Sequence, residues 1–195
     1  MDIMSNFKEL RTQDISHGTI ADTFTNEAVI DLTSPATRIV TSFTQTSPMR
    51  AAFDTTIEQA SKQLNTQRSD FILVTDEHQK LIGIVASADL QSSKIMILAQ
   101  RLGLPRSEIS LRYLMTPLSN LMGVSMKSLS YSCIGDALQT MEHHGAMFLL
   151  VTAANNEISG LISARDIARK LQIPVHISPI AHTFSEVLES IEHPH

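Results

Sequence analysis

The sequence predicts an α+β fold built from two tandem βαββα repeats related by a pseudo-twofold axis, followed by a C-terminal amphipathic helix. Two observations lead to this prediction. The stretch Ile57–Asp89 recurs without a gap as Ile134–Asp166, and eight of the 33 aligned positions are identical, whereas ordinary residue usage gives about two by chance. Each copy also holds a continuous apolar run, Phe71–Thr75 and Phe148–Thr152, as expected of a strand buried on both faces. Such copies are expected to be supersecondary units that pack on each other.

The first copy is expected to run strand, helix, strand, strand, helix. A proline is tolerated at the first residue of a strand, so a strand is predicted from Pro48 to Phe53. Thr55 or Thr56 is the expected N-cap of the following helix, whose apolar residues recur at helical spacing. The remaining predicted elements are a buried strand at 71–75, a hairpin loop at 76–80, a returning strand at 81–86, and a helix that begins near Ser87 or Asp89 and ends at Leu102, before Gly103 and Pro105.

The second copy is expected to repeat this order after a short connecting helix at 107–115. An extra turn at 126–129 has no counterpart in the first copy. The predicted elements are strands at 120–124, 148–152 and 158–163, helices at 134–141 and 166–171, and a hairpin loop at 153–157.

The predicted division of the chain is an N-terminal extension (1–29), a first repeat (30–105), a second repeat (106–176) and a C-terminal helix (177–195). Residues 38–43 are expected to form a short strand or an extended connection. In the C-terminal segment Ile180, Phe184, Leu188 and Ile191 form one apolar stripe, which predicts an amphipathic helix that docks on the module itself or on a dimer partner.

Composition argues against several classes of function. The net charge is −5 and the pI about 5.9, so no basic surface indicates a nucleic acid or an anionic membrane as a partner. No apolar run approaches the roughly 18 residues of a membrane span, and the N-terminus does not resemble a secretory signal. Cys133 is the only cysteine, which fits a reducing compartment, so a cytoplasmic location is expected.

Both copies close with the same motif, Gly83-Ile-Val-Ala-Ser-Ala-Asp89 and Gly160-Leu-Ile-Ser-Ala-Arg-Asp166, and the linker Leu111-Arg-Tyr-Leu-Met-Thr-Pro117 joins them. In these features the chain, over roughly residues 30–175, resembles a pair of cystathionine β-synthase (CBS) domains, the arrangement called a Bateman module. The resemblance implies a non-enzymatic regulatory or sensory module. It would bind an adenosine-containing ligand such as AMP, ADP, ATP or S-adenosylmethionine, require no cofactor, form a homodimer and signal to an unidentified protein partner.

The resemblance also implies a set of ligand-binding residues. In the family the motif aspartate accepts hydrogen bonds from ribose hydroxyls, which a carboxylate suits because it offers acceptors to two neighbouring donors. The position three residues earlier contacts ribose or phosphate, and the first strand of a unit walls the adenine, here Met49–Ala51 or Met122–Val124. The implied ligand-binding residues are Ser163, Arg165, Asp166, Met122, Gly123, Val124, Ser87 and Asp89. The first motif has Ala86 and Ala88 where the second has Ser163 and Arg165, so the first cleft is expected to bind more weakly.

Other interpretations remain open. Ser163 and Asp166 also fit a capping box that needs no ligand, and the chain fits a structural or protein-interaction CBS pair that has lost nucleotide binding. An enzyme is disfavoured because no catalytic constellation is found. His143 and His144 are adjacent, so they do not share a helix face, and they are interpreted as a solvent-facing pair or a helix cap. No metal site is expected.

Overall fold

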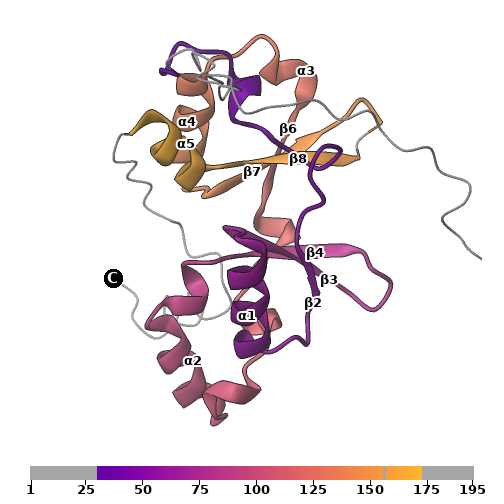
Figure 1. Cartoon of the computed structure of the whole chain (residues 1–195), viewed down its shortest axis with the longest axis vertical. Coiled ribbons are helices and arrows are strands. Elements are labelled where there is room, and N and C mark those ends of the chain that lie inside the picture. Colours follow the sequence, from indigo (N-terminus) through magenta and orange to yellow (C-terminus); the bar gives the residue numbers. More distant parts are fainter. Residues whose placement is uncertain (1–29, 156, 173–195) are drawn as a thin grey trace, which may run out of the picture.

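The protein consists of two small sheets that face each other, with helices covering the outer face of each (Figure 1). The structure, a computed structural model, describes residues 30–155 and 157–172. The predicted N-terminal extension and C-terminal helix lie outside the described residues. The predicted α+β architecture of two tandem repeats is confirmed.

The first repeat forms a four-stranded sheet in the order β2-β3-β4-β5. β2 runs parallel to β3, and the other two pairs are antiparallel. The elements of this half are β2 (Arg50–Ala52), α1 (Ile57–Gln67), β3 (Phe71–Thr75), β4 (Leu81–Ala86), the 3-10 helix η3 (Asp89–Gln91), α2 (Lys94–Leu102) and β5 (Thr116–Pro117).

The second repeat forms the matching sheet in the order β1-β8-β7-β6. Its elements are β1 (Thr41–Ser42), β6 (Met122–Ser125), α3 (Met126–Leu129), α4 (Ile134–His143), β7 (Phe148–Thr152), β8 (Ile158–Ser163) and α5 (Ala164–Leu171). β3 and β7 each lie between two strands and are buried at all or nearly all positions, so the prediction that both apolar runs are strands buried on both faces is confirmed.

Alternation along the central strands explains why they are apolar throughout. Ile72 and Val74 of β3 point to the core beneath α1 and α2. Phe71 and Leu73 point the other way, into a core between the two sheets that Phe148 of β7 also enters. Since successive side chains of a strand point to opposite faces, a strand between two apolar cores requires apolar residues at every position.

In each sheet, one of the two edge strands comes from outside that sheet's copy of the repeat. β1, which precedes the first copy, pairs antiparallel with β8, and Thr41 lies opposite Leu161. β5, which follows the first copy, pairs with β4, and Thr116 lies opposite Ile84. The 3-10 helix η2 (Ala36–Ile39) likewise contributes to the core of the second repeat. The sheets therefore do not follow the predicted division of the chain at residues 105 and 106.

Two predicted helices differ in the structure. The helix after the first motif is interrupted at Ser92, whose hydroxyl donates to the carbonyl oxygen of Asp89 at 2.8 Å, a local bond that competes with helix continuation. The predicted connecting helix at 107–115 is two 3-10 helices, η4 (Arg106–Glu108) and η5 (Leu111–Tyr113). Its backbone bonds instead to the start of α1, because Ile57 donates to the carbonyl of Ile109 and Leu111 donates to that of Thr55.

Candidate functional site

The second motif places Asp166 in the first turn of α5, close to the first repeat. Ser163 occupies the N-cap position, but its hydroxyl makes no cap hydrogen bond. The Asp166 carboxylate instead accepts a hydrogen bond from the guanidinium of Arg169, one turn along α5. The capping-box interpretation of Ser163 and Asp166 is therefore wrong.

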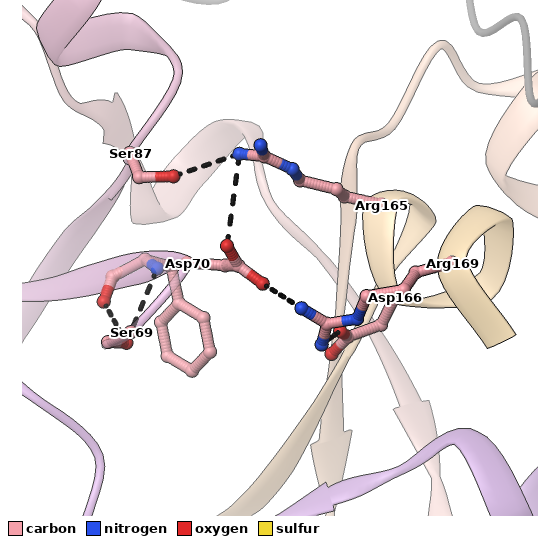
Figure 2. Close-up of polar contacts among 7 residues, drawn as sticks. Ser69, Asp70, Ser87, Arg165, Asp166 and Arg169 are labelled. Carbon is pink, nitrogen blue, oxygen red and sulfur yellow. Dashed lines mark hydrogen bonds and ion pairs between the residues drawn. The ribbon is translucent and has the colours of Figure 1, made fainter. Parts of the chain in front are cut away.

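A chain of polar contacts crosses from the second repeat to the first (Figure 2). Arg169 donates from its second nitrogen to Asp70 at 3.1 Å. Arg165 donates to the hydroxyl of Ser87 at 3.0 Å and lies 3.8 Å from the other Asp70 oxygen. Asp70, which immediately precedes β3, thus lies within ion-pair distance of two arginines of α5. One of them, Arg169, also forms an ion pair with Asp166.

Two cavities lie on either side of this cluster. The smaller, which we call the Asp166 cavity, has a volume of about 250 Å³ and lies between the segment before β2, the start of β3, and α5; its walls include Pro48, Met49, Phe71 and Asp166. The larger, the Arg165 cavity, has a volume of about 650 Å³ and lies beside the end of α1 and the turn after β4. Residues 68–70 line both cavities.

The structure brings together only some of the residues expected to bind a ligand. Asp166 lines the Asp166 cavity together with Met49, which immediately precedes β2, and residues 122–124 do not line it. Arg165 and Ser87 contact each other and line the Arg165 cavity. The Asp89 carboxylate accepts a hydrogen bond from the backbone N–H of Ala86 at 3.3 Å, within its own turn. Ser163, Met122, Gly123, Val124 and Asp89 line neither of these cavities.

The extra turn in the second repeat leaves the Asp166 cavity open. Ser125 is the N-cap of α3, and its hydroxyl accepts a hydrogen bond from the backbone N–H of Ser128 at 3.0 Å. Leu129 then packs into the core of the second repeat, beneath that repeat's sheet. α3 supplies no residue to the wall of the Asp166 cavity.

Two residues of the cluster, Asp70 and Arg169, were not anticipated. The spacing of Asp166 and Arg169 is a signal that sequence does contain, because side chains three positions apart on a helix are neighbours. Asp70 carries no such signal. It precedes a strand of the other repeat, and only the packing of the two repeats brings it to α5.

Within residues 30–155 and 157–172, no three His, Cys, Asp or Glu side chains gather as a metal site requires. Across the same ranges, no helix has the length and hydropathy that crossing a membrane requires.

Comparison with known proteins agrees with this architecture. The pattern of the CBS domain family matches residues 40–93 and 130–173, which together make up just over half of the chain. No curated protein matches the chain. Among solved structures, an uncharacterized conserved protein from Pyrococcus horikoshii is similar, with 18% identity and a TM-score of 0.52 over 75% of this chain and 98% of that one. A hemolysin-like protein containing a CBS domain, from Oenococcus oeni, has 17% identity and a TM-score of 0.50 over 72% of this chain and 92% of that one. The chain belongs to the CBS domain family and is a tandem CBS pair.

Proposed function

We propose that this protein is a non-enzymatic regulatory CBS pair that binds an adenosine-containing ligand in the Asp166 cavity and passes the occupancy of that cavity to a protein partner. CBS pairs are generally regulatory, and the chain belongs to that family. The ligand is AMP, ADP, ATP or a related molecule. Homodimer formation and a cytoplasmic location are further parts of this proposal.

The observation that carries the proposal is the place of Asp166. Asp166 lines a cavity at the boundary between the two repeats, together with the apolar residues Pro48, Met49 and Phe71. A carboxylate offers acceptors to two neighbouring hydroxyls, and apolar walls with a few polar groups are usual for a small-molecule site. A ribose on Asp166 and a base against Met49 would therefore span both repeats. A ligand there shifts how the repeats pack to the extent that it prefers one arrangement.

A second candidate is a structural or interaction CBS pair without a nucleotide. This alternative is favoured because the polar groups of the site already have partners within the protein. Asp166 forms an ion pair with Arg169, and Arg165 contacts both Ser87 and Asp70. In the ligand-binding proposal a ribose must displace Arg169 from Asp166. That contact is partly solvent-exposed, and exposed ion pairs contribute only about 0–1 kcal/mol.

Thermal unfolding with AMP, ADP, ATP and S-adenosylmethionine separates the two candidates. A ligand at a hundred times its dissociation constant stabilises the folded protein by about 2.7 kcal/mol. We expect at least one ligand to raise the melting temperature, and Asp166→Ala to weaken its binding at least tenfold, because a hydrogen bond to a charged group contributes about 1.5–3 kcal/mol.

The matched control is Asp89→Ala, the same change at the same motif position of the first repeat. It should leave most of the affinity intact, with one ligand bound per chain by titration calorimetry. Greater damage from Asp89→Ala would contradict the assignment to the Asp166 cavity. Failure of every ligand to shift the melting temperature would favour the structural CBS pair.

A further inference from the structure

The charged groups around the Asp166 cavity balance each other. Two arginines, Arg68 and Arg169, and two aspartates, Asp70 and Asp166, line it. Arg169 contacts both carboxylates, at 3.1 Å in the case of Asp70. A polyanion entering this cavity therefore meets as many negative as positive side chains.

Asp70 supplies one of the two negative charges in this balance, and it lies within ion-pair distance of both Arg165 and Arg169. One oxygen of its carboxylate forms an ion pair with Arg169, and the other oxygen lies 3.8 Å from a guanidinium nitrogen of Arg165. An arginine presents a fixed fork of donors that matches a phosphate group, but here the forks are directed to Asp70, Asp166 and Ser87. A phosphate that recruited either arginine would have to separate it from a carboxylate and then lie close to that carboxylate, where like charges repel each other.

The size of the cavity points in the same direction. Its volume of about 250 Å³ lies just below the roughly 300–1,000 Å³ of clefts that hold drug-sized ligands. Such a cavity suits a nucleoside more than a nucleoside with a chain of phosphates. The wider Arg165 cavity lies beyond Asp70, which lines both, so phosphates extending from Asp166 in that direction would pass the Asp70 carboxylate.

We propose that Asp70 is a specificity-determining residue that makes the Asp166 cavity select adenosine-containing ligands of low negative charge over nucleoside polyphosphates. This inference rests on the proposed function and adds to it the charge class of the ligand. The selecting group comes from the first repeat, whereas the ribose acceptor comes from the second.

Titration calorimetry of the full chain with adenosine, AMP and ATP tests the inference. The wild type should bind adenosine and AMP more tightly than ATP. Asp70→Asn keeps the size of the side chain and removes its charge, so the ATP-to-adenosine affinity ratio should rise at least tenfold. Because mobile ions screen exposed charges, this rise should shrink when the salt concentration is raised from 0.05 M to about 0.5 M.

Three further variants isolate the cause. Asp54→Asn makes the same change in net charge at the far end of β2, roughly 17 Å away by the length of the adjacent five-residue strand, and should leave the ratio unchanged. Asp70→Glu keeps the charge and should keep the wild-type order. Adding Arg169→Gln to Asp70→Asn should cancel most of the rise, because the cation that Asp70 had neutralised is then absent.

The outcomes are distinguishable. A ratio that is the same in the wild type and Asp70→Asn, with binding retained, overturns the role of Asp70 and leaves nucleotide binding standing. An equal change in adenosine and ATP affinity also overturns it, because it indicates a structural role only. Absence of binding of all three ligands to the wild type and to every variant overturns both this inference and the proposed function.

Discussion

At the scale of single residues, the matching helices α1 and α4 of the two repeats begin with different chemistry. Asp136 closes the start of α4, where its carboxylate accepts from the backbone N–H of Cys133 at 2.8 Å. That bond, with a smaller contribution from the Cys133 thiol, holds the pKa of Asp136 below its ordinary value of 3.8. At the start of α1 the neutral amide of Gln59 accepts from the N–H of Thr56 at 3.1 Å. The capping side chain at the start of α4 therefore titrates, whereas the one at the start of α1 does not.

We expect Asp136→Ala to destabilise the protein in a pH-dependent way. A carboxyl group whose pKa is lower in the folded than in the unfolded state contributes stability above its unfolded pKa, and this contribution is lost as the pH falls through the folded value. The variant should melt at a lower temperature than the wild type at pH 7, and the difference should disappear as the pH falls through 3.8 and below. Differential scanning calorimetry from pH 7 to pH 2.5 measures this, with Glu142→Ala in the last turn of α4 as the control. A difference that stays constant with pH would contradict the assignment.

At the scale of elements, the glycine of each motif leaves room for the backbone of an edge strand that passes close to it. A Cβ built on Gly160 of β8 would lie 2.9 Å from the carbonyl oxygen of Thr41 in β1, and one on Gly83 of β4 would lie 2.6 Å from that of Thr116 in β5. Real Cβ atoms do not approach a backbone oxygen this closely. The same residue at the same place in both repeats therefore has a structural cause, which is the close passage of a strand from outside the repeat.

Gly160→Ala should destabilise the protein by about 1–3 kcal/mol, the usual cost of added volume in a close-packed site. Gly123→Ala is the matched control, because the nearest atom to a Cβ there is the Leu150 carbonyl oxygen at 3.9 Å, an ordinary contact. Urea unfolding followed by circular dichroism should give a lower midpoint for Gly160→Ala and a midpoint close to wild type for Gly123→Ala. Equal midpoints for the two variants would show that β1 yields without cost.

Local patterns in the sequence predicted the paired inner strands residue for residue. The runs at 71–75, 81–86, 148–152 and 158–163 are β3, β4, β7 and β8 with the predicted bounds. The elements that local patterns did not place take their hydrogen bonds from distant parts of the chain. The linker at 107–115 bonds to the start of α1 rather than forming a helix, and β5 is a strand of two residues, too short to show a period. β1 lies within residues 38–43, where a short strand or an extended connection was expected, but its pairing with β8 was not predicted.

In the candidate site, too, local patterns predicted some residues, and the packing of the two repeats determines the others. Asp166 follows from the repeat motif and does line a cavity. Asp70 and Arg165 meet only because the repeats pack together, which no spacing within either repeat shows. Either Met49–Ala51 or Met122–Val124 was expected beside the base. Of these, Met49, from the first repeat, shares a cavity with the aspartate of the second.

At the scale of the whole molecule, the two repeats share one apolar core between their sheets. Phe71 and Phe148 meet there edge to face, with ring centroids 6.3 Å apart. Phe71 also lies 6.5 Å from Phe43, measured between centroids. Neither sheet buries this face without the other, so the repeats are expected to unfold together.

Phe148→Ala should therefore destabilise the first repeat as much as the second. Removal of a buried phenylalanine side chain costs about 3–5 kcal/mol, which is a large part of the stability of a typical domain. Native-state hydrogen exchange should show loss of protection by similar amounts in β3 and β7. If β7 lost protection while β3 kept it, the repeats would be independent units.

The pairing of β1 with β8 also affects the order in which the protein can fold during its synthesis. Thr41 and its partner Leu161 are separated by 161 minus 41, or 120 residues, which a ribosome adds in roughly 6–24 s. Thr116 and its partner Ile84 are separated by only 32. All four strands of the first sheet are therefore synthesised while the second sheet still awaits its inner strands. During that interval β1 has no ladder partner, and its length of two residues keeps the number of exposed backbone groups small, as suits an edge that is open to other chains.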